Sequence, residues 1–413
     1  MQGPWGRCLV IINSMRPIAL AAALWMAAAA SAQDARLNAL HASLVTLHAH
    51  AKEASAVGLG GRPELTVIKH ELRDWIETQL ASLKVDGDDK ALAARINQSL
   101  KAVSVRGAAE SQNLLGSLGE VSLSRKEEML FVTTVVGIAS CSDDESAYAY
   151  RLVNGGWQRV WESEQNDYTP KKYAPQHLIA VQVARSFLGG PAFVMTLGND
   201  QGCSSAWRPV YYRVWRIDPS GGAKLLIDGS EIAYMAATYA VGSISGEEAS
   251  GDGTVDVLVE FAEGSIDGVA NIREAVRHFL IEGDQVRRVD PVALRPRDFV
   301  DEWLTRDWKE SATWSASPVL HQWHQRLHAD FVAGDFGYPT MHCQTPDLWQ
   351  ITVTPKDAKK DFAPEPNVYF LVRWRPPYHF TMLDIGDKLW PRCTEEDREA
   401  DEGRTLFNIQ ERP

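Results

Sequence analysis

A pattern of strands and turns recurs three times between Met129 and Asp290, and it restricts the fold more than any other feature of the sequence. Three apolar runs begin 62 residues apart, at Phe131, Phe193 and Val255. Each run is followed by a loop, a second apolar strand and a tight turn that contains glycine. About four antiparallel strands per repeat is typical of a β-propeller blade. The pattern predicts a propeller-like array, with a β-sandwich or an extended meander as the alternative.

The whole chain of 413 residues is predicted to be an α+β protein: an N-terminal helical segment followed by a β-rich domain of repeated four-stranded antiparallel units. We expect a signal peptide at residues 1–32, a helical region at 33–106, three β-units of about 62 residues at 119–292, and a mixed region at 298–413. The last region combines a Trp-rich helical segment with C-terminal strands. The helical prediction rests on apolar residues at helical spacing, which include Leu65, Ile68, Leu72, Trp75, Ile76, Leu80 and Leu83.

The first 32 residues have the features of a secretory signal peptide. Arg7 and Arg16 supply positive charge, residues 18–30 are apolar, and Ala30-Ser31-Ala32 fits the small-residue cleavage pattern. An N-terminal membrane anchor is the alternative, but the apolar run is short for a span. We expect cleavage after Ala32, no transmembrane segment in the mature chain, and a periplasmic or extracellular location.

Four cysteines remain after the predicted cleavage, an even number that suits an oxidising compartment. Cys141 and Cys203 hold equivalent places in neighbouring repeats, so we expect them to pair. Cys343 and Cys393 are then the second disulfide, by elimination and by their closeness in sequence. Zinc is the weaker interpretation, because the chain has no Cys-x-x-Cys pair.

The formal net charge of −12 argues against nucleic acid as a partner. No cofactor is expected, and calcium or zinc are the alternatives. His321, His324 and His328 share one face of a predicted helix and could bind zinc, with Asp335 or His342 completing the ligand set. Histidines that line a helix–sheet interface are the other interpretation.

A second candidate metal site lies at residues 250–256, where Ser-Gly-Asp-Gly-Thr-Val-Asp leads into a strand. This stretch resembles the Asp-Gly-Asp-Gly loop of FG-GAP-type propeller repeats, and the resemblance implies calcium binding by Asp252 and Asp256. It covers seven residues, and the upstream aspartates of that loop are missing. A turn that merely requires Gly and Asp explains the same residues.

Aromatic residues concentrate in the second repeat. Strand alternation puts Tyr211 and Trp215 on one face, and with Trp207 they could form a platform for a sugar or a peptide. Packing between repeats is the alternative role of these three side chains.

No nucleophile motif or phosphate-binding loop is present in the sequence. We therefore predict an exported, non-catalytic binding or scaffolding protein of a bacterial-type cell envelope, with a protein or glycan ligand. The alternative is a secreted hydrolase with a site between Trp303 and Cys343, where tryptophans, histidines and acidic residues concentrate.

Overall fold

The computed structural model divides the chain into two compact units, Met1–Pro175 and Gln176–Pro413, which are described separately. Within them the structure describes residues 35–49, 63–85, 87–105, 116–126, 128–139, 142–166, 176–186, 190–200, 207–234, 240–246, 254–265, 268–289, 293–328, 340–353, 367–376 and 379–396. The predicted signal peptide lies outside the described residues. Among the described helices, none combines the length and the apolar character that a membrane crossing needs.

Three helices open the first unit: residues 35–49, α2 (Pro63–Leu80) and α3 (Asp89–Val103). Proline occupies the first position of α2, where a missing backbone N–H costs nothing. Asp88 caps α3, and its carboxylate accepts a hydrogen bond of 3.0 Å from the backbone N–H of Ala91. The predicted helical N-terminal part is confirmed, and its apolar stripes are buried, as at Leu72 and Leu92.

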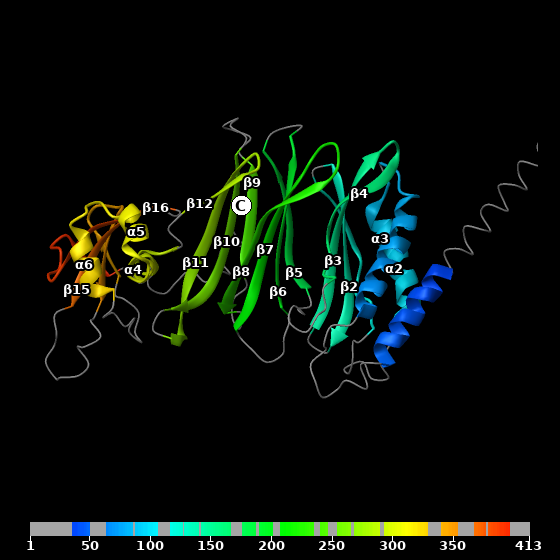
Figure 1. Cartoon of the computed structure of the whole chain (residues 1–413), viewed down its shortest axis with the longest axis horizontal. Coiled ribbons are helices and arrows are strands. Elements are labelled where there is room, and N and C mark those ends of the chain that lie inside the picture. The colour runs from blue at the N-terminus through cyan, green and yellow to red at the C-terminus, as the bar shows by residue number, and fades with distance from the viewer. Residues whose placement is uncertain are drawn as a thin grey trace, which may run out of the picture. The chain divides into compact units, whose positions relative to one another are not determined.

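The helices of the first unit lie against one face of a four-stranded sheet (Figure 1). This first sheet is an antiparallel meander of β1 (Ser122–Lys126), β2 (Met129–Ala139), β3 (Ser142–Val153) and β4 (Gly156–Ser163). Asn154 and Gly155 form the tight turn between β3 and β4 with positive φ angles of 51° and 81°. A core cluster fills the space between helices and sheet, to which the sheet contributes Leu130, Val132, Val136, Ile138, Tyr148 and Tyr150.

Two more meanders follow in the second unit. The second sheet contains β5 (Gln176–Arg185), β6 (Ala192–Asp200), β7 (Trp207–Ile217) and β8 (Ala223–Tyr234). The third sheet contains β9 (Val241–Gly246), β10 (Thr254–Ser265), β11 (Gly268–Glu282) and β12 (Gln285–Val289). The predicted four-stranded antiparallel units are therefore confirmed at the level of single sheets. No sheet closes on itself in the described part of the chain, and the propeller-like arrangement stays a prediction.

The second and third sheets share one hydrophobic core. The residues that form this core show that the 62-residue repeat does not extend to the direction in which side chains point. Phe193 of β6 and Val255 of β10 both belong to this core. Because the core lies between the two sheets, these side chains point toward each other. Equivalent positions of identically oriented sheets would point the same way. The spacing therefore marks equivalent strands, but it does not keep the side chains on equivalent faces.

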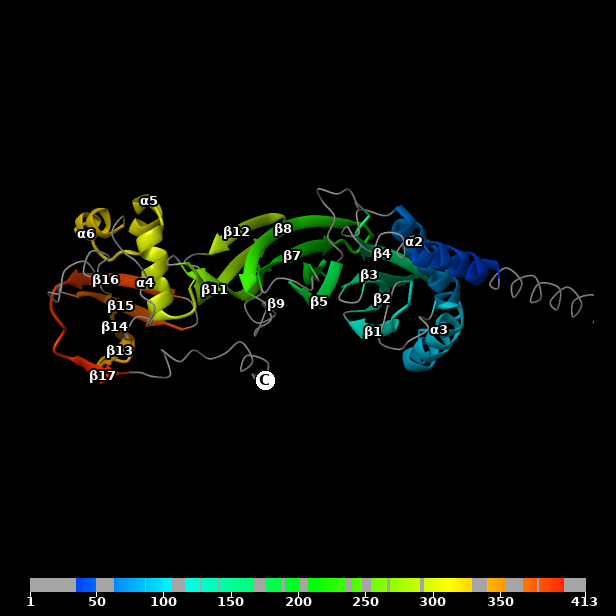
Figure 2. The ribbon, with the colours of Figure 1, turned by 90° about the horizontal axis from the view of Figure 1, so that it is seen from below.

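The second unit ends in a five-stranded sheet of order β16-β15-β14-β13-β17. Its strands are β13 (Thr340–Cys343), β14 (Leu348–Val353), β15 (Val368–Arg375), β16 (His379–Gly386) and β17 (Cys393–Glu396). Helices α4 (Pro296–Thr305), α5 (Trp308–Ser311) and α6 (Leu320–Leu327) lie on one face of this sheet (Figure 2). Their shared core includes Phe299, Trp303, Leu320, Trp349, Phe370 and Met382.

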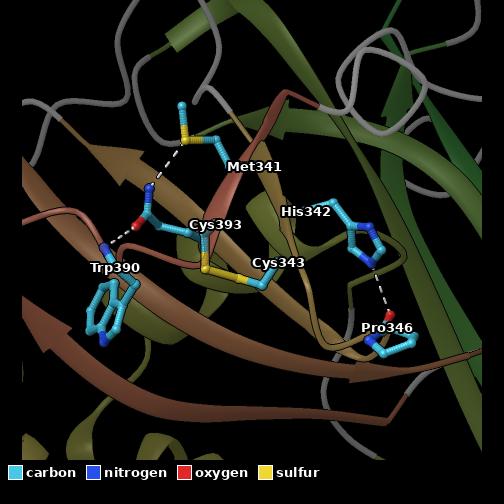
Figure 3. The surroundings of a disulfide bond; sticks show 7 residues. Met341, His342, Cys343, Pro346, Trp390 and Cys393 are labelled. Carbon is cyan, nitrogen blue, oxygen red and sulfur yellow. Dashed lines mark hydrogen bonds between the residues drawn. A yellow bond between two sulfur atoms is a disulfide. The ribbon is translucent and has the colours of Figure 1, made fainter.

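A disulfide joins Cys343 and Cys393, which are cross-strand neighbours on β13 and β17 (Figure 3). This predicted pairing is present in the structure. Buried Gln350 of β14 supports the same edge of the sheet: its side chain accepts a hydrogen bond of 2.8 Å from the backbone N–H of Trp390. Cys141 and Cys203 lie outside the described residues.

Candidate functional site

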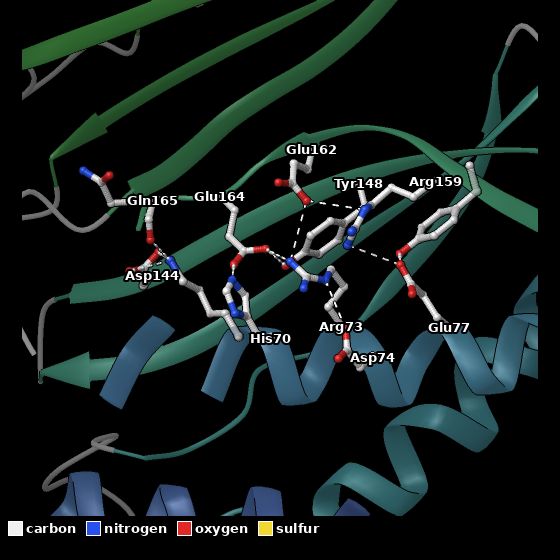
Figure 4. Close-up of polar contacts among 12 residues, drawn as sticks. His70, Arg73, Asp74, Glu77, Asp144, Tyr148, Arg159, Glu162, Glu164 and Gln165 are labelled. Atoms are coloured by element: carbon white, nitrogen blue, oxygen red, sulfur yellow. Dashed lines mark hydrogen bonds and ion pairs between the residues drawn. The ribbon is translucent and has the colours of Figure 1, made fainter. Parts of the chain in front are cut away.

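A row of charged side chains runs along the face of α2 that lies against β3 and β4 (Figure 4). Lys69, Arg73 and Glu77 are spaced four residues apart, so they lie above one another on one side of the helix. Each of them contacts a polar group of the first sheet or of the segment after β4. An interface that is otherwise apolar thus contains a continuous line of titratable groups.

Glu164, one residue beyond β4, is the centre of this line. Two donors bind one oxygen of its carboxylate, the Tyr148 hydroxyl at 2.9 Å and Arg73 Nη1 at 3.0 Å, and His70 Nε2 lies 3.1 Å from the other oxygen. The Glu164 side chain is 0% exposed, so the hydrogen bonds from Tyr148 and Arg73 replace water at one carboxylate oxygen, and His70 is the neighbour of the other. Burial, together with the neighbouring Glu164, raises the pKa of the Tyr148 phenol, which keeps the hydroxyl available as a donor.

Arg73 connects the buried carboxylate to the surface. Its Nη1 atom also lies 3.6 Å from Glu162 Oε2, and Arg159 Nε lies 3.4 Å from the same oxygen. Burial opposes the charge of Arg73, but the carboxylates, Glu164 foremost, outweigh it and raise the pKa of the guanidinium. The arginine therefore stays charged and holds both carboxylates close to one nitrogen atom.

Two members of the cluster reach solvent. The His70 side chain is 44% exposed and the Glu162 side chain is 43% exposed, whereas Glu164 lies behind them. A histidine whose ring nitrogen contacts a buried carboxylate can carry a proton, and a nearby exposed carboxylate can accept one. The arrangement can therefore transfer protons to and from a molecule at the surface.

The sequence interpretation missed this cluster, because it used residues 65–83 only for their apolar stripe. A usable signal was the spacing of three charged residues, Lys69, Arg73 and Glu77, which lie four residues apart on a second stripe of the same helix. The contribution of Glu164 had no such signal, because its partners are far away in sequence and meet it only in the folded chain.

The predicted histidine face is used differently. His324 Nε2 lies 3.1 Å from the carbonyl oxygen of Trp303 and 2.9 Å from that of Arg306, and His328 Nδ1 lies 2.6 Å from that of Leu304. Carbonyls at the C-terminal end of a helix lack partners within the helix. Here His324 of α6 and His328, one residue beyond α6, supply donors to the end of α4. Burial lowers the pKa of His324, which favours the neutral ring.

The remaining candidates of the Trp-rich region also contribute to packing. His321 stacks on Trp308 with ring centroids 4.7 Å apart. His342 Nε2 lies 3.0 Å from the carbonyl oxygen of Pro346. His324 and His328 stack with ring centroids 5.1 Å apart, while their ring nitrogens contact the backbone carbonyls.

No group of three or more His, Cys, Asp or Glu side chains in the described ranges is arranged to hold a metal ion. Asp256 instead pairs with His278 of β11, at 2.7 Å between Oδ1 and Nε2. Asp252 and Asp335 lie outside the described residues.

The aromatic candidates of the second repeat lie on β7. Trp207, Tyr211 and Trp215 are half-buried, and Trp207 packs against Tyr234 with ring centroids 5.1 Å apart. A ligand platform formed by these three residues stays a prediction.

No protein-family model and no curated protein matches the sequence. Solved structures match it distantly. A complex described as BT0996 with RGII is 12% identical over 64% of this protein and 72% of the matched one, with a TM-score of 0.25. An exo-1,5-α-L-arabinanase from a bovine ruminal metagenomic library is 10% identical over 65% and 78%, with a TM-score of 0.22. The Cellvibrio cellulosa α-L-arabinanase complexed with arabinohexaose is 8% identical over 65% and 77%, with a TM-score of 0.22.

These matches require a correction to the predicted function. The first prediction was a non-catalytic binding or scaffolding protein, whereas the matched structures are described as arabinanases and as a glycoside hydrolase. The hydrolase part of the alternative prediction agrees better with them. The likeness is too distant to give any residue of this chain a role, so the site has to be argued from its own geometry.

Proposed function

We propose that the protein is an exported hydrolase that acts on a glycan through the cluster on α2 and β4. In this proposal His70 protonates the oxygen that leaves the sugar, and Glu162 removes a proton from the attacking water. Glu164 does not touch the substrate; it orients His70 through the contact with Nε2. Water adds across the glycosidic bond, and the two protons pass through His70 and Glu162.

One observation carries the proposal: the partly exposed side chains of His70 and Glu162 are both held in place by the buried ion pair of Arg73 and Glu164. Arg73 contacts both Glu162 and Glu164, and Glu164 contacts His70. Glycoside hydrolysis needs an acid and a base on opposite sides of the scissile bond, each in an environment that suits its task. Here a buried carboxylate lies behind the histidine, and two arginines lie beside the glutamate.

Export is part of the proposal. It is supported by the Cys343–Cys393 disulfide, because disulfides persist mainly in oxidising compartments. The Arg-containing apolar start of the chain and its Ala30-Ser31-Ala32 pattern agree with a secreted protein. Secretion of a tagged full-length chain, with the mature N-terminus at Gln33, would be the direct check; retention in the cytoplasm would contradict export.

The test is an assay of the purified mature protein on linear arabinan, arabinohexaose and xylan, with release of reducing sugar as the measurement. We expect His70→Gln and Glu162→Gln each to lower kcat by about 100-fold or more, the usual contribution of a general acid or base. Glu231→Gln is the matched control, because Glu231 accepts from Arg277 in the second unit and lies outside the proposed site. No hydrolysis by the wild type, or equal losses in all three variants, would overturn the proposal.

A further inference from the structure

Lys69 is a fully buried lysine that the proposed chemistry does not use. Its side chain is 0% exposed, and lysine is almost never buried in this way unless it is paired. The Nζ atom lies 3.3 Å from both carboxylate oxygens of Asp144 on β3. It also donates a hydrogen bond to the backbone carbonyl of Gln165.

The bond to Gln165 matters because this residue directly follows Glu164. The pairing of β4 with β3 ends at Ser163, so both residues lie beyond the regular ladder. His70 and Arg73, which are on the same part of α2, contact the Glu164 side chain. Lys69 contacts the main chain next to it. One turn of helix thus holds the carboxylate and the backbone that carries it.

We propose that Lys69 is a positioning residue that fixes Glu164 behind His70, with Asp144 as its counter-ion. The consequence for catalysis rests on the proposed function, because Glu164 affects the reaction only if His70 does. The consequence for local structure is independent of it. Removing the ammonium removes its hydrogen bond to the carbonyl of Gln165, and the Glu164 carboxylate can then shift relative to the imidazole.

The charge of Lys69 makes this clamp sensitive to pH. The charged groups that act on it are Asp144 on β3 and Glu164 after β4. His70 and Arg73 are titratable residues that follow it on its own helix. Burial is the largest influence and lowers the pKa of Lys69, although Asp144 and Glu164 oppose this shift. As pH rises through the lowered pKa, the charged donor is lost and the clamp weakens. An arginine at this position stays charged throughout that range.

The experiment compares Lys69→Met and Lys69→Arg with the wild type, and uses Arg277→Met in the second unit as a control for general destabilisation. Hydrogen exchange of the peptide covering residues 160–166 reports the position of Glu164 without any substrate. Steady-state kinetics on a hydrolysed glycan report kcat, KM and the alkaline limb of the pH profile.

We expect Lys69→Met to speed exchange at residues 164–166 and to lower kcat about 10- to 100-fold with a nearly unchanged KM, as for a misplaced catalytic group. Lys69→Arg should restore most of the protection and move the alkaline limb to higher pH. Unchanged exchange in a folded Lys69→Met protein would overturn the proposal, and so would a wild-type kcat. An inactive wild type would contradict the proposed function alone, and the exchange data would then decide whether Lys69 positions Glu164.

Discussion

The two units each contain a cluster in which a tyrosine hydroxyl and an arginine bind one glutamate, and the surroundings differ. In the first unit the members are Tyr148, Arg73 and Glu164, between α2 and the first sheet. In the second unit Tyr212 Oη lies 3.3 Å and Arg277 Nε 2.7 Å from Glu231 Oε1, between the second and third sheets.

The first cluster is buried at its centre and continues to exposed His70 and Glu162. In the second, Glu231 is itself 25% exposed, and Arg277 lies over the ring of Phe261 with its guanidinium carbon 4.9 Å from the ring centroid. The same three side-chain types can therefore occur as a packing element or beside exposed titratable groups. The difference depends on which further titratable groups the fold places beside the glutamate.

The largest expected difference between the clusters is in stability. Glu164→Gln leaves Arg73 without its buried counter-charge, and breaking a buried pair in this way costs about 3–5 kcal/mol. Glu231→Gln removes a partly exposed partner and should cost about 1–2 kcal/mol. Urea unfolding of both variants measures the free energies of unfolding. Equal losses of unfolding free energy in the two variants would show that the two clusters stabilise the protein to the same extent.

Removing the disulfide tests whether the two units, and with them the two clusters, are stabilised independently of each other. Replacing Cys343 and Cys393 by serine opens a loop with a sequence separation of 50 residues, and the expected loss is about 2–4 kcal/mol in the second unit. Hydrogen exchange should become faster around β13 and β17, while the protection of α2 and β3 stays as in the wild type. Faster exchange at Tyr148 would mean that the units unfold together.

The tyrosines of the two clusters should make the free energy of unfolding depend on pH, and this effect is smaller than those of the glutamates and the disulfide. Burial, followed by the nearby Glu231, raises the pKa of Tyr212 to about 12. Between about pH 10 and 12 the unfolded chain has lost this proton while the folded chain keeps it. The free energy of unfolding should therefore fall as pH rises, by up to about 1.4 kcal/mol per pH unit.

Tyr212→Phe should remove this part of the slope, measured by urea unfolding between pH 9 and 12, an interval that brackets ordinary tyrosine ionisation. Tyr148 has its pKa raised well above the ordinary value as well, so its own contribution has the same sign and remains in the variant. A slope that is unchanged in Tyr212→Phe would contradict the assignment to Tyr212.

Sequence patterns predicted the elements well and the site poorly. Apolar spacing was sufficient for α2 and α3, since a helix buries one stripe whatever it packs against. Turn residues such as Asn154-Gly155 and the repeated apolar runs were sufficient for the meanders. The histidines of α6 were misleading, because a shared helical face is equally compatible with metal ligands and with caps for the end of α4. Their partners, the carbonyls of residues 303–306, are backbone groups that no side-chain pattern reveals.

The sequence by itself determined the helical start, the four-stranded units and the Cys343–Cys393 pair, because each depends on local periodicity or on a small number of possible partners. Only the tertiary structure decided that Phe193 and Val255 point toward each other, and that Lys69, Asp144 and Glu164 meet beside an exposed histidine. The physical reason is that a polar side chain on a helix gains its role from the charge it meets across an interface. That partner is 75 to 95 residues away along the sequence, as for Lys69 with Asp144 and Glu164.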